Sequence, residues 1–143
     1  MLDEYSAGAI LFSVNESSHR IEYLLLHHTS GHWEFPKGNF EFGEDGFETA
    51  RREIYEETGI TEIEFIKDFE SQIEYYFRRS DKLFHKRVIF YMARTNTRKV
   101  ILSTEHDAYA WKEYNEAINQ LTHKDAKDLL KEAKGVQNAG SCE

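Results

Sequence analysis

Residues 38–60, with the sequence GNFEFGEDGFETARREIYEETGI, decide how the rest of the chain is interpreted. A glycine-punctuated loop comes first, and the pattern over 47–58 predicts a helix. Asp45 is a candidate N-cap with Glu48 three residues later, and Gly59 suits the left-handed conformation that ends many helices. The stretch therefore predicts a loop, a helix and a second loop.

Three glutamates near the end of this helix are its unusual feature. Glu53, Glu56 and Glu57 fall within a sector of about 100°, because they are three and four residues apart. Like charges at these spacings destabilise a helix by about 0.2–0.5 kcal/mol per pair, and the helix dipole adds a comparable penalty. A solvated acidic face is the ordinary explanation of such a cluster. The alternative is a bound divalent cation, and oxygen ligands without His or Cys suit Mg²⁺ or Mn²⁺.

The fixed positions of the whole stretch favour the second explanation. They are Gly38, then Glu44 after five residues, then Arg52, Glu53 and Ile54 after seven more, then Glu56 and Glu57, and finally Gly59 and Ile60. This spacing resembles a complete Nudix box, the signature of hydrolases that act on a nucleoside diphosphate linked to another group. The resemblance implies an α/β/α sandwich with a mixed sheet, and a divalent metal that activates water against a pyrophosphate chain.

The resemblance also implies a role for each acidic position. The three glutamates would bind the metal together with the carbonyl of Gly38, and Glu44 and Arg52 would support and orient them. The physical requirement agrees with these roles. Metal ions clamp phosphate oxygens, lower the pKa of a bound water and neutralise the charge that develops in the transition state.

Length and composition limit the remaining possibilities. The 143 residues suffice for one domain, and the single cysteine, Cys142, cannot form an internal disulfide. The formal net charge of −8 disfavours nonspecific binding to nucleic acids or anionic membranes, and no segment approaches the ~20 apolar residues of a membrane span. We expect a cytoplasmic, monomeric protein with one domain over 1–143 and a flexible tail over 135–143.

Hydrophobic patterns place further elements on both sides of the box. Four aliphatic or aromatic stretches predict strands, a short stretch over 31–38 precedes the loop, and helical spacing returns near the C-terminus. The strands are expected over 7–14, 21–28, 60–79 and 82–94, the last two as a hairpin, and the helices within 111–121 and 122–135. Mixed elements of this kind predict an α/β fold in which helices cover two faces of a sheet.

Four segments outside the box are similar to the asymmetrical diadenosine tetraphosphate hydrolases of the animal and archaeal type. They are EYLLLHHTSGHWEFPKG (22–38), IEYYFRR (73–79), HKRVIFY (85–91) and STEHDAYAW (103–111). The resemblance implies that Tyr75 and Tyr109 hold an adenine between them, and aromatic stacking is worth about 1–3 kcal/mol per base. A core or strand-surface ring is the alternative for each. Tyr76 is expected on the opposite strand face from Tyr75.

The same resemblance assigns groups to the phosphate chain and to proton transfer. Lys37 and Lys86 match lysines placed along the polyphosphate, and His32 matches a histidine able to donate to phosphate. Glu105, in a loop, matches a glutamate that serves as general base or late metal ligand. Glu53 or Glu57 is the alternative base. No Cys partners or zinc spacing accompany the histidines, so a zinc site is not expected.

The chain also departs from the animal enzymes. Phe35 replaces a proline, Asn39 and Phe42 differ from the usual His and Pro, and FPKG resembles the FPQG of bacterial RNA pyrophosphohydrolases.

Together these patterns predict a magnesium-dependent hydrolase that splits diadenosine tetraphosphate into ATP and AMP. The enzymatic alternatives are removal of pyrophosphate from RNA 5′-triphosphate ends, or hydrolysis of another nucleoside polyphosphate or an inositol pyrophosphate. RNA would need a basic groove, for which the chain offers little beyond RRSDKLFHKR (78–87). A nucleotide-sensing module without turnover is a further alternative, but pure binding does not require the costly acidic cluster.

Overall fold

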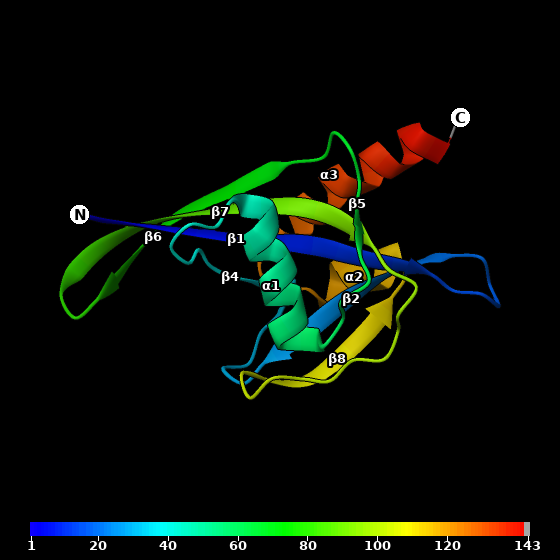
Figure 1. Cartoon of the computed structure of the whole chain (residues 1–143), viewed down its shortest axis with the longest axis horizontal. Coiled ribbons are helices and arrows are strands. Elements are labelled where there is room, and N and C mark those ends of the chain that lie inside the picture. Colours follow the sequence, from blue (N-terminus) through cyan, green and yellow to red (C-terminus); the bar gives the residue numbers. More distant parts are fainter. Residues whose placement is uncertain (142–143) are drawn as a thin grey trace.

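A mixed β-sheet organises the chain, and helices cover both of its faces (Figure 1). The computed structural model describes residues 1–141, with side chains to residue 137, so Cys142 lies outside the described residues. The strands are β1 (Leu2–Val14), β2 (Ile21–His28), β3 (Trp33–Glu34), β4 (Lys37–Asn39), β5 (Glu64–Phe65), β6 (Ser71–Arg79), β7 (Lys82–Arg94) and β8 (His106–Lys112).

The long strands β1 and β7 form the centre of this sheet. They run parallel, with Leu2 opposite Phe84 at one end of the register and Phe12 opposite Arg94 at the other. All other pairings are antiparallel: β2 and β4 pair with β1, β3 and β8 with β2, and β5 and β6 with β7. The predicted mixed sheet is confirmed.

Helix α1 (Gly46–Thr58) has the ends that the sequence predicts. The side chain of Asp45 accepts a hydrogen bond from the Glu48 amide at 2.8 Å, and the Glu48 carboxylate accepts one from the Asp45 amide at 3.1 Å. Gly59 closes the helix in the left-handed conformation, with a φ of 75°. This reciprocal capping fixes where the acidic last turn lies relative to the sheet.

Two further helices follow β8 within the described residues. They are α2 (Tyr114–Gln120) and α3 (Lys124–Ser141). We expected a tail from residue 135, but α3 continues through Gly135 to Ser141, and the last two residues lie outside the described part of the chain. No helix in that described part has a stretch long and apolar enough to cross a lipid bilayer.

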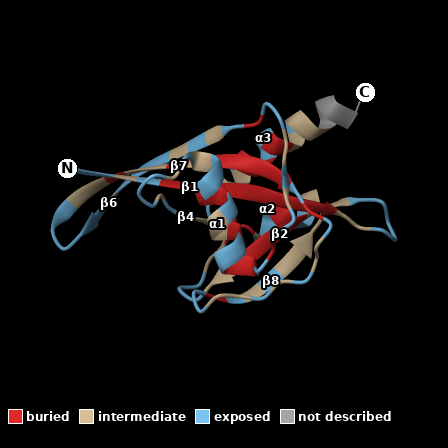
Figure 2. Ribbon diagram, in the orientation of Figure 1, coloured by how far each residue is buried: buried red, intermediate tan, exposed pale blue. Residues whose placement is uncertain are grey.

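The buried core divides into two layers because the side chains of β1 alternate between its faces. Leu11 packs with Ile54 of α1 on one face, whereas Ile10 and Phe12 pack with Leu130 of α3 on the other. Figure 2 shows the burial concentrated in the central strands and on the inner sides of the helices. The polar last turn of α1 therefore lies at the border of the first layer.

Two strand predictions need correction. The segment 60–79 is not one strand, because β5 and β6 are separated by an irregular stretch in which Asp68 has a φ of 65°. Strand β8 was not predicted, although it pairs with β2 over most of its length. The predicted hairpin of β6 and β7 is confirmed, and its turn residues Ser80 and Asp81 have φ values of 52° and 62°.

Candidate active site

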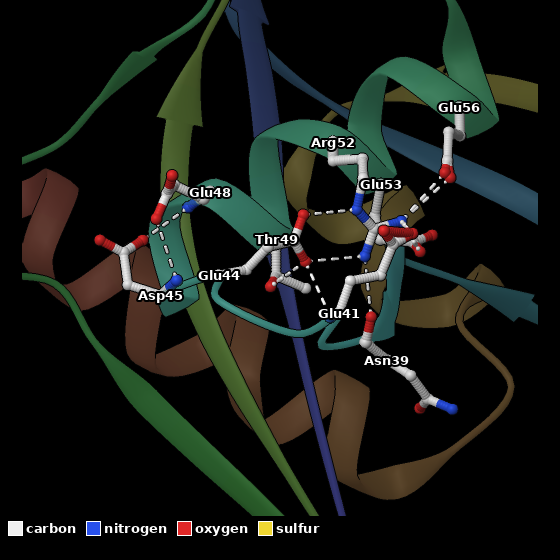
Figure 3. A network of polar contacts seen from close by, with 9 residues as sticks. All are labelled: Asn39, Glu41, Glu44, Asp45, Glu48, Thr49, Arg52, Glu53 and Glu56. Atoms are coloured by element: carbon white, nitrogen blue, oxygen red, sulfur yellow. Dashed lines mark hydrogen bonds and ion pairs between the residues drawn. The ribbon is translucent and has the colours of Figure 1, made fainter.

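Arg52 lies in the middle of the acidic cluster on α1 (Figure 3). Its Nη1 atom is 2.9 Å from Glu53 Oε1 and 2.9 Å from Glu56 Oε2. Its Nη2 atom donates to the carbonyl of Asn39 at 2.8 Å, which ties α1 to β4. One guanidinium thus partly neutralises two of the three glutamates and fixes the helix against the loop that precedes it.

Glu44 accepts hydrogen bonds from the Nε and Nη2 atoms of the same guanidinium. Arg52 donates to it twice, from Nε at 2.7 Å and from Nη2 at 3.0 Å, and the Thr49 hydroxyl donates at 2.8 Å. These hydrogen bonds lower the pKa of Glu44 to about 2, and those from Arg52 have the largest effect. Glu44 is therefore ionised at neutral pH and holds Arg52 in place.

Glu57 differs from the other two glutamates because it is buried and, among the described residues, makes no ion pair with a lysine or arginine. Its side chain is 3% exposed, and among the described residues no hydrogen-bond donor reaches its Oε1 atom. Burial, followed by the adjacent carboxylates of Glu53 and Glu34, raises the pKa of Glu57 well above its ordinary value. The raised pKa favours the neutral form of Glu57 in the free protein, and a nearby cation would favour its carboxylate.

The surroundings of Glu57 fit a divalent cation. Carboxylate oxygens are the ligands that Mg²⁺ and Mn²⁺ prefer, and a metal ion would stabilise the ionised form of Glu57. In the part of the chain that the structure describes, no three His, Cys, Asp or Glu side chains converge as a preformed metal site. Glu53 and Glu56 contact Arg52 instead.

Gly38 permits β4 to lie directly against the acidic turn. A β-carbon at this position would lie 2.1 Å from the Glu53 Cδ atom and 2.2 and 2.3 Å from its two oxygens. Real side chains essentially never approach so closely, so the glycine is required for this packing. The close approach brings the backbone of Gly38 to the side chain of Glu53, two groups for which a common metal was predicted.

A cavity of about 610 Å³ opens beside this cluster. Five of the candidate site residues from the sequence line it, and they come from separate elements. They are His32 before β3, Lys37 of β4, Glu57 of α1, Tyr75 of β6 and Glu105 before β8. The fold thus brings a buried acid, an exposed acid, a lysine, a histidine and an aromatic ring to one space.

Tyr109 and Lys86 do not line this cavity. Tyr109 lies opposite Leu26 in the register of β8 and β2, on the face that carries α1, whereas Tyr75 belongs to the face that packs on α3. The structure therefore does not bring the two tyrosines together. Tyr76 stacks on His85, 4.5 Å between ring centroids, on the other face from Tyr75.

Lys86 lies next to the loop that bears Gly38. Its Nζ atom donates to Asn39 Oδ1 at 3.0 Å and is 3.7 Å from Glu4 Oε1. Burial, and then the charge of Lys37, lower the pKa of Lys86. The two lysines are thus close enough to repel each other, which is the arrangement that an anionic chain between them would relieve.

Sequence reasoning missed Glu34, a buried residue of this cavity. Its Oε1 atom is 3.0 Å from His32 Nε2, and its Oε2 atom is 2.9 Å from His106 Nε2. Burial raises the pKa of Glu34, but the hydrogen bond from His106 and the charge of Lys37 outweigh it, so the net shift is downward. The available signal was weak: strand alternation places His32 and Glu34 on the same face, but nothing in the sequence indicates His106 as a partner.

The family follows from a comparison with known proteins. A family model described as the NUDIX domain matches residues 4–133. The chain belongs to the NUDIX domain family. As a member it is a Nudix pyrophosphohydrolase, and enzymes of this family generally use divalent metals.

Individual relatives of this Nudix hydrolase give a finer comparison. The mouse bis(5′-nucleosyl)-tetraphosphatase [asymmetrical] is 38% identical over 118 residues, which cover 78% of each chain. The crystal structure of a Caenorhabditis elegans Ap4A hydrolase binary complex superposes with a TM-score of 0.83 at 28% identity, covering 95% of this chain and 98% of that one. An RNA pyrophosphohydrolase of Bartonella clarridgeiae is 44% identical, but over only 45 residues, 32% of this chain and 26% of its own. Homology therefore extends along the chain only for the asymmetrical tetraphosphatases among these three.

Proposed function

We propose that this Nudix hydrolase cleaves diadenosine tetraphosphate asymmetrically into ATP and AMP, with Mg²⁺ as its metal. The observation that carries the proposal is the common cavity of Glu57, Lys37, Tyr75 and Glu105. In that order, these groups are suited to bind the metal, to bind the phosphate chain, to stack on an adenine ring and to accept the proton of the attacking water. The chain-long similarity to asymmetrical tetraphosphatases supports the same substrate.

The metal would be held by Glu53, Glu56 and Glu57 with the carbonyl of Gly38. When bound, a divalent ion lowers the pKa of coordinated water and neutralises charge on phosphate oxygens. Arg52 keeps Glu53 and Glu56 on one side of the helix, and Glu44 keeps Arg52 in place. The carboxylates are thereby oriented before the substrate arrives.

Lys37 and His32 would contact the phosphate chain. Both line the cavity, and both lie beside Glu34, with the Lys37 Nζ atom 3.8 Å from Glu34 Oε1. An ammonium and an imidazole N–H are suitable donors to phosphate oxygens. Tyr75, 37% exposed at the side of the cavity, would stack on one adenine.

Glu105 would accept the proton of the attacking water. Glu105 lines the same cavity as Glu57, in a loop whose backbone is fixed by a hydrogen bond from the Thr29 amide to the Glu105 carbonyl at 2.9 Å. An exposed carboxylate can take a proton and release it to solvent. Tyr109 lies outside the lining, so we expect Tyr75→Ala to raise KM by more than Tyr109→Ala does.

Product analysis tests the proposal. Wild type and Glu57→Gln are incubated with diadenosine tetraphosphate and Mg²⁺, and the nucleotides are separated by anion-exchange chromatography. We expect ATP and AMP from the wild type and a loss of at least ~100-fold in the variant, because it removes a carboxylate from the metal set. A triphosphorylated RNA oligomer in parallel provides the contrast: release of pyrophosphate from RNA with an intact dinucleotide would reject the substrate and leave the family chemistry standing.

A further inference from the structure

Glu34 connects two groups of residues that the proposed function uses separately. It lies in β3, is 9% exposed, and faces the cavity together with Glu57. An ionised carboxylate only accepts hydrogen bonds, so the Nε2 atoms of both His32 and His106 must carry the protons that they share with it. One side chain thus determines the orientation of two imidazoles.

The first contact group of Glu34 lies on the phosphate side of the cavity. Its Oε1 atom is 3.0 Å from His32 Nε2 and 3.8 Å from Lys37 Nζ. The other ring nitrogen of His32, Nδ1, also has a partner, because it is 3.0 Å from the Ser30 hydroxyl. Glu34 therefore limits where the two candidate phosphate donors can point.

The second contact group leads to the candidate base. The Oε2 atom of Glu34 accepts from His106 Nε2 at 2.9 Å, and the side chain of His106 is 1% exposed. The other ring nitrogen, Nδ1, has no hydrogen-bond partner among the described residues, so the hydrogen bond to Glu34 orients this ring, with Glu57 Oε1 3.9 Å from the same Nε2 atom. His106 follows Glu105 directly, at the point where the preceding loop joins β8.

We propose that Glu34 is a positioning residue that sets His32 and Lys37 for phosphate binding and, through His106, holds Glu105 at the reacting end of the cavity. The inference rests on the proposed function, because that function gives these residues their roles. It adds a carboxylate that the proposed function assigns neither to the metal nor to proton transfer and that still affects both substrate affinity and turnover.

Steady-state kinetics of three variants separate the two effects. Glu34→Gln leaves one acceptor for two donors, and we expect kcat to fall roughly tenfold, as is typical when a supporting residue is lost. KM should rise about threefold to tenfold through the weakened hold on His32 and Lys37. His106→Phe should reduce kcat by a similar factor and leave KM within about twofold of the wild-type value. The kcat of the double variant should lie within about twofold of that of Glu34→Gln, because both substitutions affect kcat through the same contact.

Hydrogen exchange of the free protein gives a readout that requires no substrate. The amides of Thr29 and His106 donate to the carbonyls of Glu105 and Ser103, so their exchange reports how firmly the Glu105 loop is held. We expect faster exchange in Glu34→Gln than in the control Glu74→Gln. The control breaks a contact of the same kind, between Glu74 Oε1 and His85 Nε2 on the β6–β7 hairpin.

The outcomes distinguish this inference from the proposed function. Unchanged exchange in Glu34→Gln, or kinetic losses that multiply in the double variant, would overturn the positioning role even if diadenosine tetraphosphate is the substrate. Faster exchange with no turnover of that dinucleotide by the wild type would support the hold on the loop and reject the substrate. If Glu34→Gln does not fold, Glu34→Asp is the second variant: it keeps the charge, withdraws it from both imidazoles, and overturns the inference if its kcat and exchange equal those of the wild type.

Discussion

Gly38→Ala changes the position of one carboxylate without replacing it. The added β-carbon would lie 2.1 Å from the Glu53 Cδ atom, whereas contacts below 3.0 Å are essentially absent from real side chains. The Glu53 carboxylate must therefore retreat by roughly 0.9 Å or more, and it can do so because it is the end of a flexible side chain. The φ of Gly38 is outside the left-handed region, so alanine does not strain the backbone.

This displacement sets the expected size of the effect. A misplacement of about 1 Å at a reacting centre costs on the order of 100-fold in rate, which corresponds to ~2.7 kcal/mol of transition-state stabilisation. Stability should change little, since alanine in a strand gains about 0.5–1 kcal/mol over glycine and the loosened contact of Glu53 with Arg52 offsets part of that gain. The variant should therefore be folded, stable and slow.

The assay measures initial rates on diadenosine tetraphosphate over a range of Mg²⁺ concentrations, with thermal unfolding in parallel. Gly8→Ala is the contrasting variant: its β-carbon would lie 2.2 Å from the Pro36 carbonyl oxygen, a backbone atom that cannot withdraw, so stability should fall with it. A Gly38→Ala enzyme with a rate within about threefold of the wild type would refute the reasoning, because Glu53 would then not need its observed position.

Three further variants test the packing and electrostatics of the fold. Leu130→Ala, at a fully buried site of α3, should lower the free energy of unfolding by about 2–5 kcal/mol in urea titrations, and a loss below 1 kcal/mol would mean that α3 packs loosely. Gly135→Ala, inside α3 with nothing near its new β-carbon, should raise that free energy by about 0.5–1 kcal/mol without changing activity. The pKa of Glu44 is depressed from 4.5 to about 2, so its stabilising contact with Arg52 is present above pH 4.5 and is lost as the pH falls towards 2. The stability difference between wild type and Glu44→Gln should therefore shrink from about pH 6 to about pH 3, and a constant difference would reject this role.

Local patterns in the sequence were sufficient to predict much of the fold. The caps of α1 at Asp45 and Gly59 and the bounds of β2 follow from nearby residues, and the structure confirms them. Strand β8 escaped prediction because its sequence, HDAYAWK, contains few aliphatic residues and owes its strand conformation to pairing with β2. Such pairing depends on residues about eighty positions away, which no window along the chain contains.

In the candidate site, too, the features that depend on nearby residues were predicted and those that depend on distant residues were not. The spacing of the box places Glu53, Glu56 and Glu57 on one flank of a helix, but it does not show that Arg52 contacts two of them and not the third. Glu34 was missed because its partner His106 is 72 residues away in the chain. Roles that depend on the arrangement of distant loops required the fold.

The three glutamates at the end of α1 differ in how far neighbouring cations neutralise them, and this difference indicates where the reaction takes place. Arg52 partly neutralises Glu53 and Glu56, while Glu57 is 3% exposed next to other carboxylates, and His106 Nε2 lies 3.9 Å from its Oε1 atom. If the acids served only solubility, the exposed glutamate would be the one left without a partner, because water screens an exposed charge well. The reverse holds here, since Glu56 is 45% exposed and ion-paired whereas Glu57 is buried. Glu57 lines the cavity and its pKa is raised, so a cation that enters the cavity would favour the ionised form of this buried carboxyl group.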